Sequence, residues 1–352
     1  MWGQIKTLPY TPLGDRGKIK FMYVRQTCLI ELADKYQLAG LHGCEIKNSV
    51  HQIVQTAKVT LPLSLVQQNN DLLERVKLID KIKEGDAITI DLGYNGKNKR
   101  EFTGFIKRIN LKQPLELECE DRMYLLRKTY YTQNFKKNSI KDVLKYLLDG
   151  LFTTHGLRLE LYDKMPELTV TNFMIDNANG VEVLQKIADT YPMFNSFLTT
   201  IDGKDILYCG LLYGLKRQEV IYDLDTNTVN HSELKYNQEE AIVYHVKVVN
   251  FKPDGTKHEF TYGPKKGQEV TLHFSGIHTE EQLKELSKVE LSKKVTGYRG
   301  VIETMLWPDV QVGDIAIIRD KQFGRSGTGY IGTVTTTFAG GARRKPEIDI
   351  SL

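Results

Sequence analysis

The sequence predicts a mainly β protein in which two similar small antiparallel β-barrels flank a helix-containing α+β insertion. Three observations support this fold class: one strand-like block occurs twice, its apolar and polar residues alternate, and the sequence between the copies has a helical period. At 352 residues the chain exceeds the roughly 250–300 residues at which one hydrophobic core stops growing. We therefore expect an N-terminal segment with the first barrel at residues 1–127, the insertion at 128–228, and the second barrel with an inserted helix at 229–352.

The first copy of the block begins at Gly85-Asp86 and reads EGDAITIDL, a polar turn NGKNK, TGFIKRI and LELECED. The second copy begins at Gly313-Asp314 and reads VGDIAIIRD, GRSG, TGYIGTV and PEIDISL. In LELECED and PEIDISL every second residue is acidic or polar, as in a half-buried strand. We therefore expect residues 346–352 to form a core strand of the second barrel.

Further strand-like stretches precede each copy. CEIKNS and AKVTLPLSL come before the first, and AIVYHVKVVNF and HEFTYG flank a turn at residues 253–255 before the second. Five or six short strands per copy are typical of a small antiparallel barrel. The inserted helix of the second copy is predicted by a capping box at Thr279–Gln282, followed by an apolar stripe of Leu283, Leu286 and Val289.

The sequence between the copies changes to a period of 3.6 residues. Ser139 is expected to cap a helix with apolar residues at helical spacing, namely Ile140, Val143, Leu144, Leu147, Leu148 and Leu151. A second helix is expected from Val181 to Tyr191, ending at Pro192. A hairpin turning at residues 202–203 then follows, so the insertion is predicted to be α+β.

Composition predicts a soluble globular protein, with 41% hydrophobic and 26% charged residues. No stretch resembles a signal peptide or approaches the ~18 apolar residues of a membrane span, so we expect cytoplasmic synthesis and no stable membrane insertion. A net charge of +4 is too small to indicate nucleic-acid binding. The basic run Arg343-Arg344-Lys345 is interpreted as a solvated turn between two strands. The isolated cysteines are expected to be free, mostly buried thiols: Cys28, Cys44, Cys119 and Cys209.

Two loop-like motifs imitate ligand sites without completing them. Gly324 and Gly329 have the glycine spacing of a phosphate-binding loop, but Tyr-Ile follows them inside a strand, so we interpret them as hairpin glycines. Asp223, Asp225 and Asn227 imitate half of a calcium loop, yet threonine and leucine occupy the positions that need glycine and glutamate, Thr228 and Leu234. We interpret this second segment as a polar linker between domains.

The remaining candidates for chemistry are also weak. His273 and His278 lie five residues apart, which is not a usual metal-ligand spacing, and we expect ordinary surface or strand residues. An acidic cluster is better explained as the wet outer face of a strand than as a glycosidase pair: Glu116, Glu118, Glu120 and Asp121. We therefore predict no catalytic, cofactor-binding or metal-binding residues and no cofactor.

Three longer phrases carry a family resemblance. They are IKEGDAITIDLGYNGKNKREFTGFIKRI with LELECEDRMYLL, ANGVEVLQKIADTYPMF with DILYCGLLYG, and TGYRGVIETMLWPDVQVGDIAII through GYIGTVTTTFAGGARRKPEIDI. In this order and spacing they resemble the baseplate or tail hub proteins of bacteriophages, a family that includes the myophage central hub, the phage late-control proteins and the N-terminal part of VgrG from type VI secretion. The resemblance covers most of residues 44–352.

The resemblance implies a non-enzymatic virion structural protein of the tail or baseplate, made in the cytoplasm of a bacterial host. In that family two barrels per chain assemble as a homotrimer into a pseudo-sixfold ring around a central channel. The ring joins a hexameric tail tube to a trimeric spike, contacts other baseplate components and meets DNA only by its passage through the channel. VgrG continues into a spike that this sequence lacks, so the spike is expected to be a separate protein. Residues 1–43 are interpreted either as an arm reaching a neighbour or as an edge strand.

Two other functions remain open as alternatives. Stand-alone barrels of this size bind oligosaccharides or nucleic acids, but the acidic outer faces of the repeated strands argue against nucleic acid. A tail-associated cell-wall hydrolase is a further alternative, for which the three predicted domains leave no spare length. The sequence leaves open whether the tail is contractile, whether the source is a phage, a prophage or a secretion system, and which residues line the channel.

Overall fold

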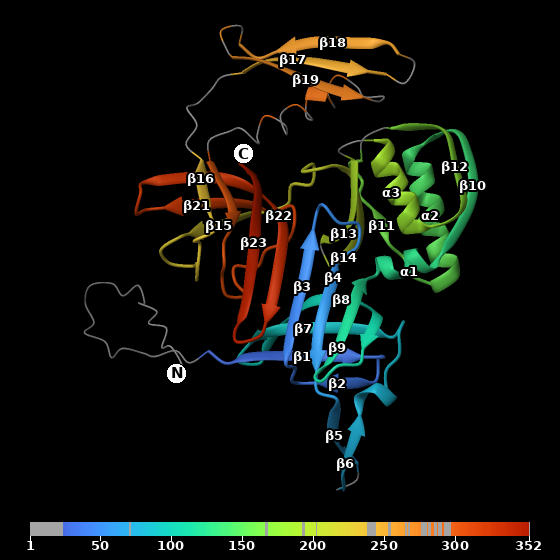
Figure 1. Ribbon diagram of the computed structural model, residues 1–352, viewed down its shortest axis with the longest axis vertical. Helices are drawn as coiled ribbons and strands as arrows, with labels where there is room; N and C mark the ends of the chain where they lie inside the picture. The colour runs from blue at the N-terminus through green and yellow to red at the C-terminus, as the bar shows by residue number, and fades with distance from the viewer. Residues whose placement is uncertain are drawn as a thin grey trace.

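The computed structural model confirms a mainly β fold with a helical insertion. It describes residues 24–351 except 70–71, 166–167, 192–193, 202, 238–243, 253–254, 265, 267, 276–279, 281–282, 285–286, 288–290 and 292–296. Figure 1 shows a large central β structure, a helical part on one side and a small separate sheet at one end. The four cysteines are free and buried, as predicted.

The first copy of the block and the strands around it form what we call the first lobe. Its strands are β1 (Gln26–Leu32), β2 (Tyr36–Leu38), β3 (Gly43–Ser49), β4 (Thr56–Leu61), β7 (Ala87–Tyr94), β8 (Lys97–Asn110) and β9 (Leu115–Asp121). A hairpin of β5 (Ser64–Asn69) and β6 (Leu72–Lys77), followed by the 3₁₀ turn η1 (Leu78–Asp80), is inserted between β4 and β7. Part of the N-terminal segment is thus an edge of this lobe, because β1 pairs with β7 and β2 with β1.

The second copy forms the second lobe. Its strands are β15 (Glu219–Asp223), β16 (Lys235–Asn237), β20 (Gly297–Val301), β21 (Ile315–Asp320), β22 (Arg325–Phe338) and β23 (Ala342–Ser351). The predicted C-terminal strand is confirmed, since β23 pairs with β20 and β22 and buries Ile348 and Ile350. Leu352 lies outside the described residues. β15, from the range assigned to the insertion, pairs in parallel with β21.

Both lobes belong to one 13-stranded sheet. Its strand order is β16-β20-β23-β22-β3-β4-β9-β8-β7-β1-β2, with β21 and β15 continuing from β22 on a branch. The connection between the lobes is the antiparallel pairing of β3 with β22. The two repeats are therefore lobes of a continuous sheet.

The strands expected just before the second copy form a sheet of their own. β17 (Tyr244–Phe251) lies between β18 (Lys257–Tyr262) and β19 (Gln268–Ser275), and it runs parallel to β19. The expectation that they pair within the second barrel is wrong, because Val246 and Val248 pack on the inserted helix and create a separate small core. The described helical residues are Glu280, Leu283, Lys284, Ser287 and Leu291. The rest of the predicted capping box and stripe lies outside the described residues: Thr279, Glu281, Gln282, Leu286 and Val289.

The insertion contains the predicted helices. Its elements are β10 (Tyr130–Ser139), α2 (Ile140–His155), β11 (Glu160–Leu161), β12 (Thr169–Asn179), α3 (Gly180–Thr190), β13 (Phe194–Ile201) and β14 (Lys204–Leu211). The preceding helix α1 (Met123–Lys128), from the range assigned to the first barrel, packs in the same core. The predicted hairpin is confirmed by the pairing of β13 with β14. Among the described residues, no helix has the length and apolar character needed to span a bilayer.

The insertion is itself a duplication of a strand, a cap and a helix. Ser139 ends β10 and caps α2, and its side chain and that of Asp142 exchange hydrogen bonds with each other's backbone at 3.1 and 3.0 Å. Asn179 ends β12 and forms the same capping box with Glu182 on α3, with both bonds at 3.0 Å. Each box satisfies N–H groups that a helix start leaves unpaired. β10 and β12 pair antiparallel, so the two units face each other over a shared apolar core.

The repeated sequence block produces the same backbone geometry in both lobes. In the first lobe, the Gly85 N–H donates to Ile106 O at 2.7 Å, and the Ile106 N–H donates to Asp86 O at 2.9 Å. In the second lobe, Gly313-Asp314 and Ile331 form the same two bonds at 2.9 and 3.0 Å. The glycine is required because its φ is +91° in the first copy and +88° in the second, where other residues are strained.

The glycine of the repeated TG(F/Y)I phrase permits two strands to approach closely. A Cβ atom at Gly104 would collide with the backbone of Glu120 and Asp121 on β9. At the matching Gly329 it would collide with Ile348 on β23. Each repeat therefore has glycine where β8 approaches β9 or where β22 approaches β23. A steric requirement explains why this glycine occurs in both copies.

We expect Gly104→Ala to lower the free energy of unfolding by about 1–3 kcal/mol, because the added methyl group must displace backbone atoms. Gly40→Ala is the matched control, since no atom lies within 4 Å of a Cβ built there, and it should change stability by less than about 0.5 kcal/mol. Urea unfolding of the three proteins would measure both effects. Equal stability of the wild type and the Gly104 variant would contradict the steric role.

Candidate functional site: the junction between the lobes

The boundary between the lobes contains a buried arginine. Arg344 lies on β23 with 2% of its side chain exposed, and its guanidinium donates to Glu101 Oε1 of β8 at 2.5 Å. It also donates to Leu306 O at 2.6 Å and Pro308 O at 3.2 Å, and lies 3.3 Å from Asp309 Oδ1. Burial raises the pKa of Glu101, and the arginine opposes this shift. The pair therefore joins the first lobe to the second in a fixed geometry.

This arrangement corrects the interpretation of residues 343–345 as a solvated turn. The run lies inside β23, after a turn that ends at Gly341. Because side chains of a strand alternate, Arg343 and Lys345 point toward Glu303, at 3.5 and 3.6 Å, while Arg344 points into the junction. A charge run alone does not reveal this burial, because Glu101 is 243 residues away.

The tip of the β7–β8 hairpin of the first lobe rests on the second lobe. The Tyr94 hydroxyl donates to Ala342 O at 2.7 Å and accepts from the Leu306 N–H at 3.3 Å. Its ring packs edge-to-face on Trp307, with centroids 4.9 Å apart. Lys99, on the same hairpin, forms an ion pair with Asp309. The hairpin thus acts as a clamp across the lobe boundary.

A histidine of the first lobe also contacts the second lobe. His51, in the turn after β3, lies with Nε2 2.5 Å from Asp349 Oδ2 on β23. The hydrogen bond to Asp349 raises the pKa of His51. Gly332 leaves room for this pair, because a Cβ atom there would collide with the Asp349 carboxylate. The protonated form of His51 is therefore the one that the junction favours.

The acidic cluster on β9 is only in part the wet outer face that the sequence predicts. Glu120 and Asp121 are each 2% exposed, and basic or amide side chains cover the cluster. The contacts are Lys58 and Lys112 with Glu116, Asn110 with Glu116 and Glu118, and Lys107 and Arg127 with Glu120. The expectation is wrong for Glu120 and Asp121, which are buried, whereas the partly exposed Glu116 and Glu118 alternate with buried residues as expected.

Asp121 lies where the first lobe continues into the insertion. It accepts the N–H groups of Gln55 at 3.2 Å and Met123 at 3.0 Å, which joins the end of β9 to the start of α1. Burial raises the pKa of Asp121 to about 8, although these two hydrogen bonds act against the shift. The role of this carboxyl group is therefore structural: it holds the end of β9 against the start of α1.

The two loop-like motifs have structural roles. Gly324 adopts a φ of +62° in the β21–β22 turn, which agrees with a hairpin glycine, and Gly329 lies inside β22. Asp223 ends β15 and pairs with Lys321 at 2.5 Å, which lowers the pKa of the carboxyl group. The Asn227 side chain bonds the backbone of Asp223 and of Ile221. This turn lies within the second lobe, so the interpretation as a linker between domains is wrong.

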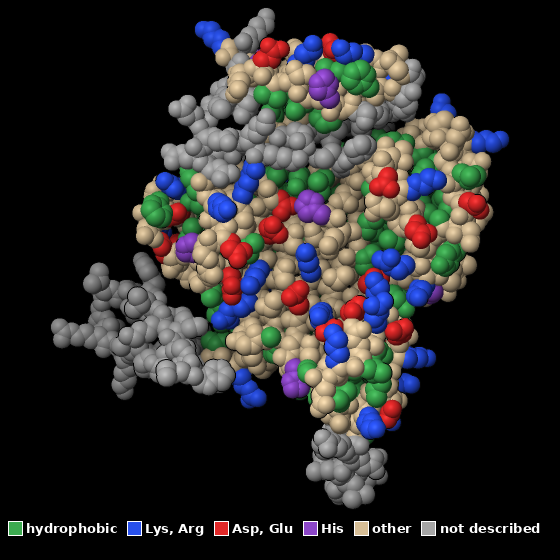
Figure 2. Space-filling model, in the orientation of Figure 1, with side chains coloured by type: hydrophobic (Ala, Val, Ile, Leu, Met, Phe, Trp, Pro, Cys, Tyr) green, Lys and Arg blue, Asp and Glu red, His purple; other side chains and the backbone are tan. Residues whose placement is uncertain are grey.

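The described residues contain no group of three or more histidine, cysteine or acidic side chains that could hold a metal ion. His273 lies exposed on β19 and stacks on Phe251, with ring centroids 6.5 Å apart. His278 lies outside the described residues. On the face shown in Figure 2, basic and acidic side chains are interspersed, and this face has no continuous basic groove.

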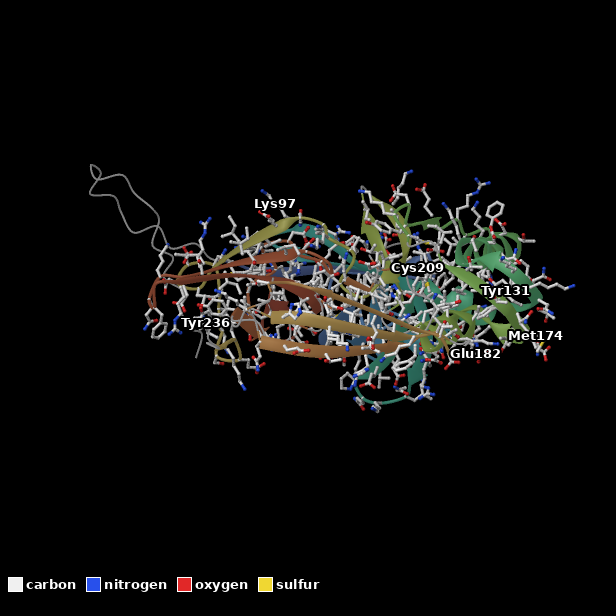
Figure 3. All side chains as sticks on the ribbon, turned by 90° about the horizontal axis from the view of Figure 1, so that it is seen from above. Lys97, Tyr131, Met174, Glu182, Cys209 and Tyr236 are labelled. Atoms are coloured by element: carbon white, nitrogen blue, oxygen red, sulfur yellow. The ribbon has the colours of Figure 1, made fainter. Side chains whose placement is uncertain are left out.

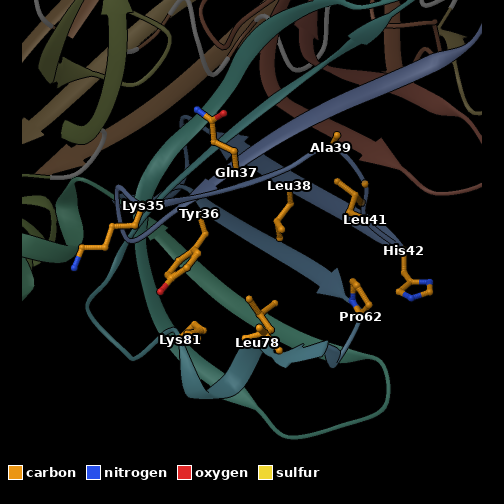
Figure 4. Close-up of a pocket in the computed structure, with 12 residues that line it drawn as sticks. Lys35, Tyr36, Gln37, Leu38, Ala39, Leu41, His42, Pro62, Leu78 and Lys81 are labelled. Atoms are coloured by element: carbon orange, nitrogen blue, oxygen red, sulfur yellow. The ribbon is translucent and has the colours of Figure 1, made fainter. Parts of the chain in front are cut away.

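A hollow of about 640 Å³ lies at the outer end of the first lobe. It is lined by Lys35, β2, the following loop, Pro62, Val76, Leu78 and Lys81. Figure 4 shows Tyr36, Leu38 and Leu78 around the same space. The lining contains Lys35, His42 and Lys81 but no carboxylate or thiol, so it offers neither a carboxylate pair nor a mixed metal-ligand set.

Comparisons with known proteins define the class of fold. No family model matches the chain, and no curated protein matches it in sequence. Among solved structures, the 43 kDa tail protein of prophage MuSo2 from Shewanella oneidensis superposes with a TM-score of 0.58 at 13% identity, over 92% of this chain and 97% of that one. A tail protein from Neisseria meningitidis superposes with a TM-score of 0.56 at 12% identity, over 92% of this chain and 96% of that one.

A third similar structure is the E. coli c3393 protein, described as a component of the type VI secretion system that resembles the T4 tail proteins gp27 and gp5. It gives a TM-score of 0.56 at 9% identity, over 92% of this chain and 76% of that one. At these identities the likeness establishes the fold. The chain has the fold of phage tail proteins and of their type VI secretion counterparts, which confirms the resemblance seen in the sequence.

We expect Arg344→Met to destabilise the protein by about 3–5 kcal/mol, because it leaves the Glu101 carboxylate buried without its cation. Adding Glu101→Leu to this variant should restore a large part of the lost stability, because neither charge of the buried pair then remains. Arg343→Met is the control: it removes a half-buried ion pair and should cost at most about 1 kcal/mol. Urea unfolding of the four proteins tests the series, and similar costs at 343 and 344 would contradict it.

We expect the stability of the wild type to fall as pH rises from about 4 to about 8. The folded-state pKa of Asp121 exceeds its unfolded value, so its favourable contribution is complete below the unfolded pKa and is lost as pH rises through the folded one. The slope from one such group is at most about 1.4 kcal/mol per pH unit. Asp121→Asn should remove this part of the slope in urea melts at pH 5–8. Identical slopes in the two proteins would exclude the mechanism.

Proposed function

We propose that this chain is a structural hub protein of a phage tail or baseplate, or of a prophage-derived injection machine, and not an enzyme. It works as a homotrimer whose six lobes form a ring between a sixfold tail tube and a separate threefold spike, with DNA passing through the channel. The tail-protein fold over 92% of the chain supports the class. The observation that supports the ring is the strand pairing between the two lobes of the chain.

Inside the chain, the lobes join through β3 of the first and β22 of the second. The ladder runs from Ser49 opposite Thr333 to Cys44 opposite Phe338. The Ser49 and Thr333 hydroxyl oxygens lie 3.0 Å apart, so side chains meet directly across this boundary. The first lobe contributes β3 to this contact and the second lobe contributes β22, so the contact is heterologous. Heterologous contacts between successive units generate a closed ring when the rotation from one unit to the next divides a full turn.

Each of these two strands has a counterpart in the other lobe. β4 and β20 both pair with the last strand of their block, β9 and β23, so β16, which pairs with β20, corresponds to β3. β8 corresponds to β22, because both carry the TG(F/Y)I phrase. Within the described residues, β16 pairs with β20 alone, and residues 108–110 of β8 pair with β9 alone.

The second contact of the ring follows from this correspondence. Pairing β16 of one chain with β8 of the next places Asn237 opposite Arg108 and Lys235 opposite Asn110. Figure 3 shows Tyr236, at the centre of β16, at the opposite end of the molecule from Tyr131 and Met174 of the insertion, so the insertion lies away from this edge. Three chains then alternate first and second lobes, which gives pseudo-sixfold symmetry from threefold assembly.

We expect the double variant Arg108→Cys with Asn237→Cys to form disulfides between chains and yield a covalent trimer of about 121 kDa from chains of 40.3 kDa. The four native cysteines are buried and should react slowly. Ser49→Cys with Thr333→Cys is the positive control, which should close within one chain. Arg108→Cys with Lys235→Cys is the offset control, since diagonal positions lie about 7–8 Å apart.

Non-reducing gels and native mass spectrometry at high protein concentration distinguish the outcomes. A covalent trimer from the in-register pair and little product from the offset pair support the ring. A stable dimer with a twofold interface in every condition would refute it.

A further inference from the structure

The lobes differ in what their hairpin tips touch. The β7–β8 tip of the first lobe is covered by the second lobe through Tyr94, which contacts Ala342 in the strand after the β22–β23 turn and Leu306 after β20. The corresponding β21–β22 tip of the second lobe, residues 321–324, carries Phe323 with 64% of its surface exposed. Covering this ring with a partner would remove its apolar surface from water, which favours association.

Phe323 is held in place by its own lobe. Its N–H donates to Asp320 Oδ1 at 3.1 Å, which fixes the turn. The Arg325 guanidinium lies over both the Phe323 ring, at 5.4 Å, and the Tyr236 ring, at 4.6 Å. Tyr236 is the central residue of β16, so this stack links the aromatic tip to the strand edge that pairs with the next chain. Such a preorganised ring loses little conformational entropy on binding.

The position that would receive this tip lies in the first lobe. The β22–β23 turn, beside which Tyr94 rests, corresponds to the β8–β9 turn at residues 111–114, because β22 and β23 are the counterparts of β8 and β9. Leu111 opens this turn, directly after the β8 residues proposed to pair with β16, and it is 74% exposed. Two exposed apolar side chains thus lie at corresponding places on the two sides of one expected contact.

We propose that Phe323 of one chain packs on Leu111 and the β8–β9 turn of the next chain, as the intermolecular counterpart of the Tyr94 clamp. The partner is a second copy of this chain, because the contact continues the β16–β8 edge and needs the first lobe of a neighbour. This inference rests on the proposed ring and identifies the apolar contact that holds it.

The test uses charge substitutions on the two lobes separately. Phe323→Lys and Leu111→Lys should each weaken trimer formation at least tenfold, measured by native mass spectrometry or light scattering over a concentration series. Phe323→Lys combined with Leu111→Glu places opposite charges at the contact and should recover much of the loss at low salt. Phe251→Lys, on an exposed residue of β17, is the matched control and should leave assembly unchanged.

Thermal melting checks that each variant is folded, and the two positions lie on different lobes, so a folding defect in one leaves the other as the test. Unchanged trimer formation by folded Phe323→Lys and Leu111→Lys, with the 108–237 disulfide still forming, would overturn this contact and leave the hub function standing. Absence of both the trimer and that disulfide from the wild-type background would overturn the ring and this contact with it.

Discussion

The pairing of β3 with β22 is the interaction on which the rest of the architecture depends. It joins two lobes that are far apart in sequence into one sheet, and the buried Arg344–Glu101 pair fixes how the lobes are oriented. A buried guanidinium tolerates few alternative geometries, because moving it away from its acceptors leaves a charge without solvent or partner. The junction therefore specifies a single arrangement of the lobes, which any ring with a defined number of members requires.

Duplication occurs in this chain at two scales. In the lobes, the repeated elements are a glycine turn and a glycine in a strand, which reproduce the same backbone bonds and the same close crossing. In the insertion, the repeated element is a capping box at the junction of a strand and a helix. In both cases the positions retained are those where geometry restricts the choice of residue, while the surfaces of the copies differ. The same backbone can then offer similar edges to different neighbours.

Local features of the fold could be predicted from the sequence, whereas contacts between distant segments could not. Alternation in LELECED predicts β9, and Ser139 with its stripe of leucines predicts α2, because each signal is contained within one element. The Asn179–Glu182 box carried the same local signal and was missed. β15 was also missed, although Val220 and Tyr222 alternate with exposed residues. Its parallel partner lies almost one hundred residues further along the chain, and nothing in five residues identifies it.

The contacts of the candidate site could be predicted from the sequence even less than the fold. The repeat indicated where two similar lobes begin. The contacts that join the lobes, from Tyr94 to Ala342, from His51 to Asp349 and from Glu101 to Arg344, each link residues more than 240 positions apart. The burial of Arg344 could not be predicted from the residues around it, because a buried charge needs a partner and its partner Glu101 lies 243 residues away. The facing positions of Phe323 and Leu111 likewise follow only from the fold, because the two residues lie on turns of different lobes and are 212 residues apart.

A difference between the two contacts of the proposed ring follows from chain connectivity. The contact inside the chain forms between tethered lobes, so no association cost opposes it. It combines the polar contacts of Tyr94 and Lys99 with packing of the Tyr94 ring on Trp307. The contact between chains must overcome an association cost of about 4–15 kcal/mol before it yields any net stability. Burial of apolar surface is the main term that can supply this free energy. On this argument, exposed apolar side chains belong at the intermolecular copy of the contact, which is where Phe323 and Leu111 lie in the proposed ring.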